Sequence, residues 1–258
     1  SHLMPKFSEL TAPLREVLSA LHKQRAAGKR TQRRPKGAPV VEAHPDTPWP
    51  EWWAQEAEQA FLDGPVEKLV HLTDAWRDRQ RGSLSEETFD FLAKHGFFGM
   101  IIPQRYGGLG FSATAMAAVI SRATTVSNAL AVTIMVPNSL GPGELLLHYG
   151  TEEQKMRFLP RFATGELRGG IALTEPDAGS DLAGMRATAK DMGDHWLLNG
   201  AKTYISNGIN ADLVVVAAKT DPENNPHAMG LFLVERGMEG FERGRNLKKM
   251  GMKAQDTA

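Results

Sequence analysis

The sequence predicts an α+β protein in which a helical region precedes an antiparallel β region. Two observations support this fold class. From about residue 53 to residue 165, apolar residues recur at the spacing of one helix face. After about residue 168 the apolar runs become short, β-branched or aromatic, and turns separate them. We therefore expect a basic extension over residues 1–45, a helical domain over 46–168 and a β domain over 169–258.

Capping signals and prolines place several of the expected helices. Ser85 precedes two glutamates, and acidic residues in a first turn complement the helix dipole. Thr151 precedes Glu-Glu-Gln, the sequence of a capping box. Asp63-Gly64-Pro65 predicts a break in an earlier helix, and Pro137 and Pro142 predict a kink or restart after an apolar helix.

Short apolar runs beyond residue 168 predict the strands. Asn199-Gly200 lies between the apolar run 196–198 and the segment 202–206, and this dipeptide is the strongest short hairpin signal. The runs 213–217 and 231–234 predict two further strands. The β region is therefore expected to be antiparallel.

Composition excludes several classes of site. The 258 residues contain 30 basic and 30 acidic side chains, and this balance argues against a dedicated nucleic-acid binder. The chain has no cysteine, which excludes disulfides, thiolate catalysis and iron–sulfur clusters. No apolar run is expected to reach the roughly 18 to 20 residues that a membrane-spanning helix needs. We also see no signal-peptide pattern.

The basic segment over residues 23–36 leaves two interpretations open. It carries seven lysines and arginines and no acid. Such a segment near anionic lipid would gain about 1 kcal/mol per basic residue, which would make the protein peripherally membrane-associated. The alternative is a solvated linker, because its glycine and proline residues disfavour a helix.

Several common catalytic motifs are absent from the sequence. We find no P-loop, no Rossmann glycine pattern in the required strand–helix context, no H-E-x-x-H zinc motif and no nucleophile elbow. No metal site is therefore predicted.

Two segments carry the strongest functional signal. Residues 171–181 read IALTEPDAGSD, and residues 199–208 read NGAKTYISNG. The first resembles the acyl-CoA dehydrogenase signature, and the second resembles the hairpin motif of the same family. The resemblance continues in 103–110, 141–160 and 249–253, and it covers about residues 55–258 in all. Two further segments, 61–67 and 136–142, resemble more specifically the large bacterial acyl-CoA dehydrogenases of fatty-acid β-oxidation.

The family resemblance implies a fold and a reaction. The fold would be a helical N-terminal domain, a β-barrel-like middle domain and a C-terminal four-helix domain. The reaction would be FAD-dependent α,β-dehydrogenation of a fatty acyl-CoA to the trans-2-enoyl-CoA, with a carboxylate removing the α-proton and flavin N5 accepting the hydride. Electron-transfer flavoprotein would accept the electrons. The full-length protein would form a homo-oligomer in the bacterial cytoplasm.

The resemblance also places the catalytic glutamate in the C-terminal domain, beyond residue 258. We therefore expect no catalytic base within this chain, and we expect the chain alone to be inactive or nearly so. Glu175 and Asp181 are acidic residues near the signature, but neither is expected to be the base.

The resemblance assigns roles to particular residues. Backbone groups at Leu173 and Thr174, with the Thr174 hydroxyl, would meet the flavin pyrimidine edge. Ser206 would lie near N5, and Tyr204, where the family commonly has tryptophan, would stack on the ring. The turn at Gly179-Ser180 would offer N–H groups to phosphate, and Ser180 would also contact the CoA part of the substrate. The implied flavin-binding residues are Ile171, Leu173, Thr174, Gly179, Ser180, Tyr204, Ile205 and Ser206.

Two other functions remain open at this point. An acyl-CoA oxidase on the same scaffold would carry the same motifs and pass electrons to O₂. A non-catalytic binding or scaffold module would use the folded domains without needing FAD.

Overall fold

The computed structural model describes residues 56–139, 141–225 and 227–258. The chain divides into two units, and the larger one comprises Pro48–Lys190 with Leu197–Ala258. This larger unit carries the elements discussed below, apart from a hairpin tip at Asp191–Trp196. The expected extension over residues 1–45, with its basic segment, lies outside the described residues.

Helices occupy the first part of the described chain, as predicted. They are α2 (Glu56–Phe61), α3 (Glu67–Leu72), α4 (Ala75–Arg81), α5 (Glu86–Lys94), α6 (Ala113–Thr124), α7 (Asn128–Asn138), α8 (Pro142–Tyr149) and α9 (Glu152–Ala163). The predicted break at Asp63-Gly64-Pro65 is wrong. A π-helical turn over Leu62–Val66 carries the chain from α2 into α3, so Pro65 is accommodated inside a continuous helical segment.

The predicted helix starts are confirmed at both capping residues. Ser85 Oγ accepts from Thr88 N at 3.0 Å at the start of α5. Thr151 Oγ1 accepts from Gln154 N at 3.2 Å, and Gln154 Oε1 accepts from Thr151 N at 2.9 Å, which completes the capping box of α9. The restart falls at Pro142, the first residue of α8, whereas Pro137 lies inside α7.

One buried amide ties α7 to the segment that precedes α6. Asn138 is fully buried, and its Nδ2 donates to Phe97 O at 2.7 Å and to Ile134 O at 2.8 Å. Its Oδ1 accepts from Ile101 N at 3.3 Å. The apolar core of the helical region surrounds this contact with Phe97, Met100, Val119, Leu130 and Ile134. Asn138 therefore fixes where the C-terminal end of α7 lies.

Five short strands form a mixed sheet. They are β1 (Gly169–Ala172), β2 (Thr188–Asp191), β3 (Trp196–Asn199), β4 (Leu213–Lys219) and β5 (Met229–Glu235). The predicted strands at 213–217 and 231–234 are confirmed as parts of β4 and β5. β4 pairs antiparallel with β5 but parallel with β1 and, through one residue pair, with β2. The expectation of an antiparallel sheet is therefore wrong for β1 and β2. The chain between each of them and β4 is long enough for the crossover connection that parallel pairing requires.

The predicted hairpin turn at Asn199-Gly200 is also wrong. The turn that joins β2 to β3 lies at Asp191–Trp196, where Met192 N donates to His195 O at 2.9 Å. Gly200 passes instead so close to Ala187 that a Cβ at Gly200 would lie 2.5 Å from the Ala187 Cβ. After Gly200 the chain forms no strand over 202–206, apart from an isolated bridge between Ser206 and Thr257. Tertiary contacts therefore override the local turn signal.

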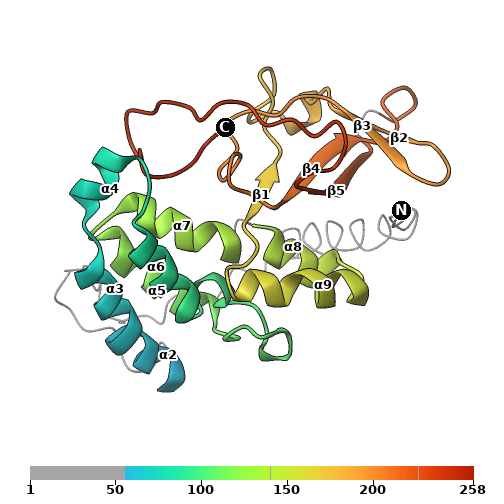
Figure 1. Ribbon diagram of the computed structural model, residues 1–258. Coiled ribbons are helices and arrows are strands. Elements are labelled where there is room, and N and C mark those ends of the chain that lie inside the picture. The colour runs from blue at the N-terminus through green and yellow to red at the C-terminus, as the bar shows by residue number, and fades with distance from the viewer. Residues whose placement is uncertain (1–55, 140, 226) are drawn as a thin grey trace, which may run out of the picture. The chain divides into compact units, whose positions relative to one another are not determined.

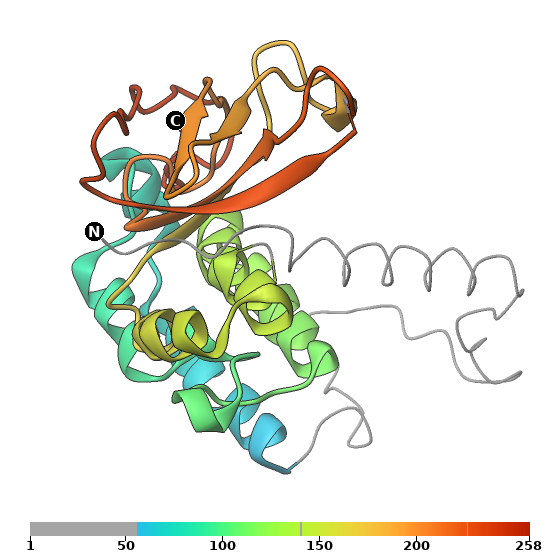
Figure 2. The ribbon, with the colours of Figure 1, turned by 90° about the vertical axis from the view of Figure 1, so that its right-hand side faces the viewer.

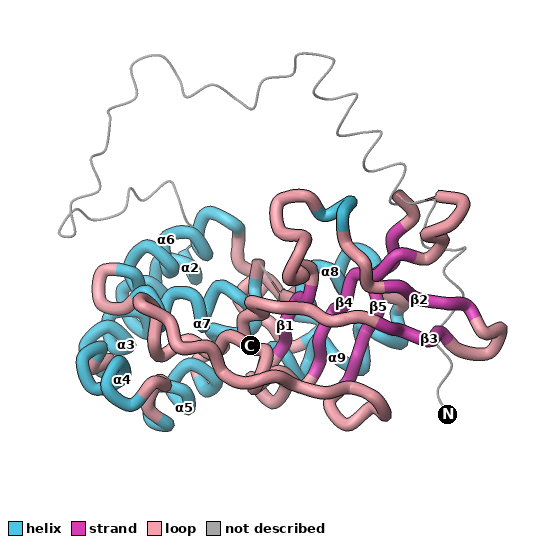
Figure 3. Tube along the Cα trace, turned by 90° about the horizontal axis from the view of Figure 1, so that it is seen from above, coloured by secondary structure: helices cyan, strands magenta, loops and turns pink. Residues whose placement is uncertain are grey.

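The helices and the sheet form separate layers within the larger unit. Figures 1 and 2 show the sheet on one side of the helices, with β1 above α7 and α8. The chain that follows β5 runs back along the sheet toward α4 before it returns to Ala258 (Figures 1 and 3). This return brings the last residues of the chain to the boundary between the two layers.

The segment Asn128–Tyr149, which contains α7 and α8, is long and apolar enough to cross a membrane by length and composition alone, with a mean hydropathy of 1.3. The sequence-based expectation of no such run is therefore not met. Within the protein, 59% of an 18-residue stretch of this segment is buried, and both helices contact β1. A helix buried in a protein core can have the same length and composition as one that spans a membrane.

Replacing Asn138 with alanine should lower the free energy of unfolding by about 1–3 kcal/mol, because Phe97 O and Ile101 N would lose a buried partner. Denaturant unfolding measures this loss. The exposed Asn128, at the start of the same helix, supplies the control, and Asn128→Ala should change stability by less than about 0.5 kcal/mol. Equal effects of the two substitutions would contradict the anchoring role of Asn138.

Candidate functional site

The two motif segments lie side by side and are joined by direct hydrogen bonds. Thr203 N donates to Thr174 O at 2.9 Å. Lys202 Nζ donates to Leu173 O at 3.0 Å. One residue past the second motif's serine, Asn207 Nδ2 donates to Gly169 O at 2.9 Å. The second segment therefore follows β1 and its extension from Gly169 to Thr174.

A buried ion pair locks the two segments together. Lys202 Nζ lies 2.7 Å from Glu175 Oε1, and the two side chains are 10% and 5% exposed. The Glu175 carboxylate also accepts from Arg186 N at 2.6 Å and from Ala187 N at 3.0 Å. The carboxylate is thus enclosed by three donors from two different segments.

The surroundings of Glu175 determine its protonation. Burial raises the pKa of this carboxyl, but the hydrogen bonds from Arg186 N, Lys202 and Ala187 N together outweigh burial and leave the pKa below its ordinary value. The carboxylate is therefore ionised at neutral pH and committed to its three donors. The expectation that Glu175 is not the catalytic base stays a prediction.

The end of the chain supports the second motif from its other side. Ile205 N donates to Ala258 O at 2.7 Å, and Ala258 N donates to Ile205 O at 3.0 Å. Asn207 N donates to Asp256 O at 3.1 Å. Lys249 Nζ in turn holds this terminal segment through Gln255 O and Thr257 Oγ1, each at 2.6 Å. The segment around Ser206 is thus supported on both sides.

A cavity of about 440 Å³ opens beside the joined segments. Six of the predicted flavin-binding residues line it, namely Ile171, Leu173, Thr174, Tyr204, Ile205 and Ser206. The described part of the chain offers no hydrogen-bond partner to the hydroxyls of Thr174 and Ser206. Two hydroxyl donors therefore remain free for a ligand on the wall of this cavity.

Tyr204 presents its ring to this cavity from a strained backbone. Its φ is +57°, in the left-handed region that aromatic residues rarely adopt. The side chain is 68% exposed, so burial of the ring does not compensate for this conformation. Backbone strain of this kind concentrates at functional sites and costs on the order of 1–3 kcal/mol. A flat ring held open at a cavity wall is suited to stacking against a planar ligand.

The opposite wall of the cavity comes from helices that the sequence analysis did not assign to the site. Its residues are Val136 and Ser139 near the end of α7, and Gly141, Glu144, Leu145, His148 and Tyr149 on or beside α8. Glu144 and His148 are spaced by four residues, as are Leu145 and Tyr149, so each pair shares one face of a helix. That spacing indicates a common face, but it does not reveal that the face meets the motif segments.

The structure does not bring the predicted Gly179 and Ser180 to this cavity. Both residues are exposed in a turn, and a Cβ at Gly179 would meet no atom within 4 Å. The neighbouring Asp181 caps the short 3₁₀ helix Leu182–Gly184, where it accepts from Gly184 N. Phosphate and CoA binding by Gly179 and Ser180 therefore stay predictions. Among the described residues, no cluster of His, Asp and Glu side chains is able to hold a metal ion.

The depressed pKa of Glu175 predicts how stability depends on pH. Because the folded-state pKa lies below the unfolded value near 4.5, ionised Glu175 stabilises the fold above that pH, and this contribution is lost as pH falls through the folded value. Denaturant unfolding across this range should show a smaller pH dependence for Glu175→Gln than for the unsubstituted protein. The control Glu166→Gln removes an exposed partner of Arg161 and should keep the original dependence. Identical pH profiles for both variants would contradict the assignment.

Comparison with known proteins places this architecture in a family. The chain matches two family models, "Acyl-CoA dehydrogenase, N-terminal domain" over residues 54–166 and "Acyl-CoA dehydrogenase, middle domain" over residues 170–258. The mitochondrial long-chain specific acyl-CoA dehydrogenase of Mus musculus is 41% identical in an alignment 215 positions long that covers 79% of this chain and 46% of the mouse protein. The caffeyl-CoA reductase-Etf complex subunit CarC of Acetobacterium woodii is 42% identical over 173 residues, covering 67% of this chain and 45% of that subunit.

A solved structure agrees with these matches. The glutaryl-CoA dehydrogenase from Mycobacterium smegmatis in complex with FADH2 superposes with a TM-score of 0.71 at 29% identity, over 80% of this chain and 52% of that one. The chain spans about half the length of the relatives it matches. The two family models together cover the described helices and all of the mixed sheet except Gly169. The chain therefore belongs to the acyl-CoA dehydrogenase family, and it corresponds to the N-terminal and middle domains of that family.

Proposed function

We propose that the protein is an FAD-dependent dehydrogenase that converts a fatty acyl-CoA to its trans-2-enoyl-CoA. The observation that carries this proposal is the cavity wall on which Thr174, Tyr204 and Ser206 meet. The wall combines two unpartnered hydroxyls with an exposed ring, and these groups come from the two motifs that resemble the family's flavin-binding segments.

The residues of this cavity fit an isoalloxazine ring. A volume of about 440 Å³ lies within the range of small-molecule and cofactor sites, about 300–1,000 Å³. Polar donors lie on one wall, whereas Val136 and Leu145 supply apolar surface from the helices. FAD, when bound, would accept a hydride from the substrate β-carbon.

Each residue of the motif wall has a defined task in this proposal. Backbone groups of Leu173 and Thr174, with the Thr174 hydroxyl, would bind the pyrimidine edge of the flavin. Ser206 Oγ would donate near N5, and the Tyr204 ring would stack on the flavin plane. The apolar surface of α7 and α8 would exclude water from the thioester, which strengthens the polar contacts inside the cavity.

Removal of the α-proton requires a free carboxylate. Glu175 is committed to its ion pair, and among the described residues lining the cavity Glu144 is the one acid. Glu144 is exposed at the start of α8 and therefore lacks the enclosed position that holds a general base against its substrate. We propose that the base belongs to a region corresponding to the part of the relatives outside the matched half.

Two partners complete the proposal. Acyl-CoA would be the substrate, and electron-transfer flavoprotein would be the electron acceptor. Support for the second comes from CarC, a relative whose name describes a subunit of a reductase–Etf complex. A homo-oligomer is proposed from the family resemblance alone.

An activity assay tests the proposed reaction and the proposed origin of the base. A full-length protein containing this sequence, with FAD and a fatty acyl-CoA, should reduce an artificial dye. The 258-residue chain alone should turn over at least about 10²-fold more slowly, because none of the described residues on the cavity wall is a positioned base. If the chain alone turns over at the full-length rate and Glu144→Gln removes this activity, Glu144 is the base and the proposal is wrong on that point. Peroxide formation in place of dye reduction would indicate an acyl-CoA oxidase.

A substitution at Tyr204 distinguishes a loss of flavin affinity from a loss of folding stability. Glycine readily adopts the φ of +57° found at residue 204, so Tyr204→Gly should not lower the free energy of unfolding. The same variant should bind FAD about 2- to 10-fold more weakly, because it loses a stacking contact of about 0.5–1.5 kcal/mol. Titration followed by flavin fluorescence measures this affinity, and the control Tyr204→Trp should retain it. Unchanged FAD affinity in Tyr204→Gly would contradict stacking at this position.

A further inference from the structure

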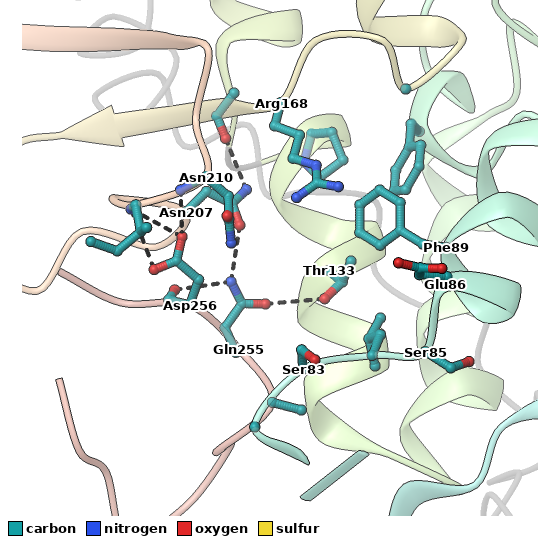
Figure 4. A pocket seen from close by; sticks show the side chains of 18 of the residues that line it. Ser83, Ser85, Glu86, Phe89, Thr133, Arg168, Asn207, Asn210, Gln255 and Asp256 are labelled. Atoms are coloured by element: carbon teal, nitrogen blue, oxygen red, sulfur yellow. Dashed lines mark hydrogen bonds between the residues drawn. The ribbon is translucent and has the colours of Figure 1, made fainter. Parts of the chain in front are cut away.

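A second cavity, of about 370 Å³, lies between the helical layer and the return of the chain after β5. Its walls come from the loop before α5, from α7, from the start of β1 and from the segments near residues 207–210 and 254–256 (Figure 4). The lining contains none of the predicted flavin-binding residues, so the first cavity does not account for it.

Arg168, directly before β1, directs an unpaired charge into this cavity. Its backbone is fixed, because Arg168 N donates to Asp212 Oδ2 at 2.9 Å and Arg168 O accepts from Asp212 N at 2.7 Å. Its guanidinium carbon lies 4.1 Å from the centre of the Phe89 ring. No acid in the described part of the chain pairs with this half-buried guanidinium. Figure 4 shows it pointing toward the space between the Phe89 ring and the Asn207 and Asn210 side chains.

Further hydrogen-bond donors surround the same space. The Asn210 side chain has no partner among the described residues, and Asn246 uses only its Oδ1, which accepts from Thr257 N at 3.3 Å. The carboxylate of Asp256 accepts from Ile209 N at 3.0 Å and from Asn210 N at 2.8 Å, so it is satisfied by backbone amides. The Asn210 and Asn246 amide nitrogens are therefore free donors near the guanidinium fork.

The remaining lining residues define the charge and shape of a ligand. Glu86 is the other acidic residue on the wall, and its charge disfavours a dianion such as phosphate at neutral pH. Leu84, Phe89, Phe98 and Pro137 supply apolar surface beside the guanidinium. A planar carboxylate matches the fork of an arginine in a bidentate contact, and an apolar tail would cover the rings.

We propose that this cavity binds a small organic monocarboxylate with a short apolar tail, and that Arg168 is its principal anchor. The site is independent of the proposed flavin cavity. It uses Thr133 and Pro137 of α7, whereas the flavin cavity uses Val136 of the same helix and Ser139, which follows it.

Isothermal titration of the complete chain with hexanoate tests this site. Arg168→Met keeps an apolar side chain over Phe89 but removes the fork, and it should weaken hexanoate binding at least about 10-fold, as expected for loss of a charge-assisted hydrogen bond. Asn210→Ala should weaken binding by a smaller factor. Arg77→Met is the matched control, because Arg77 is exposed and, among the described residues, pairs with Asp74 alone, the residue that caps its helix. This variant should bind hexanoate as before. Hexanamide, which has the same size without the charge, should bind at least about 10-fold more weakly than hexanoate.

Several results would overturn the proposal. They are an absence of hexanoate binding to the unsubstituted chain, equal affinity for hexanoate and hexanamide, and unchanged hexanoate affinity in Arg168→Met. Tighter binding of inorganic phosphate than of hexanoate would refute the carboxylate class. A parallel loss of FAD affinity in Arg168→Met would assign the cavity to the flavin site. Thermal unfolding checks that each variant folds. If Arg168→Met does not fold, the hexanoate affinity of Asn210→Ala still tests the proposal.

Discussion

The buried ion pair between Glu175 and Lys202 is the contact on which the proposed site depends. Lys202 reaches both Leu173 O and the Glu175 carboxylate, so a residue of the second motif is anchored to two residues of the first. A pair of this kind contributes little net stability, because desolvation offsets attraction, but it makes alternative arrangements costly by leaving a buried charge unpaired. We infer that its main effect here is to fix one arrangement of the two segments.

That fixed arrangement explains how a strained residue is maintained at the cavity. Tyr204 lies between Thr203, which bonds to Thr174, and Ile205, which bonds to Ala258, so both of its neighbours are held. The surrounding hydrogen bonds impose the left-handed backbone that the side chain would not choose. Packing and hydrogen bonding elsewhere thus support a local conformation that is useful for binding rather than for folding.

The sequence alone predicted the structure correctly where interactions between neighbouring residues determine it. Ser85, Thr151 and Pro142 act through their own backbone and side chains, and each begins a helix where its pattern predicted. The Asn199-Gly200 signal failed because the approach of Ala187, distant in sequence, sets the path of the chain there. The parallel pairing of β1 with β4 is likewise a property of the topology.

The two cavities likewise could be predicted from the sequence only in part. Motif resemblance identified Thr174, Tyr204 and Ser206, but the helical wall with Glu144 and His148 depends on how α8 crosses β1. Arg168 lies outside every motif, between α9 and β1, and only the fold places its guanidinium over Phe89.

A crystal structure of the complete protein with FAD tests the central claim most directly. We expect the isoalloxazine to contact the Thr174 and Ser206 hydroxyls with the Tyr204 ring against its face. A flavin bound elsewhere, with this wall closed by protein side chains, would contradict the account.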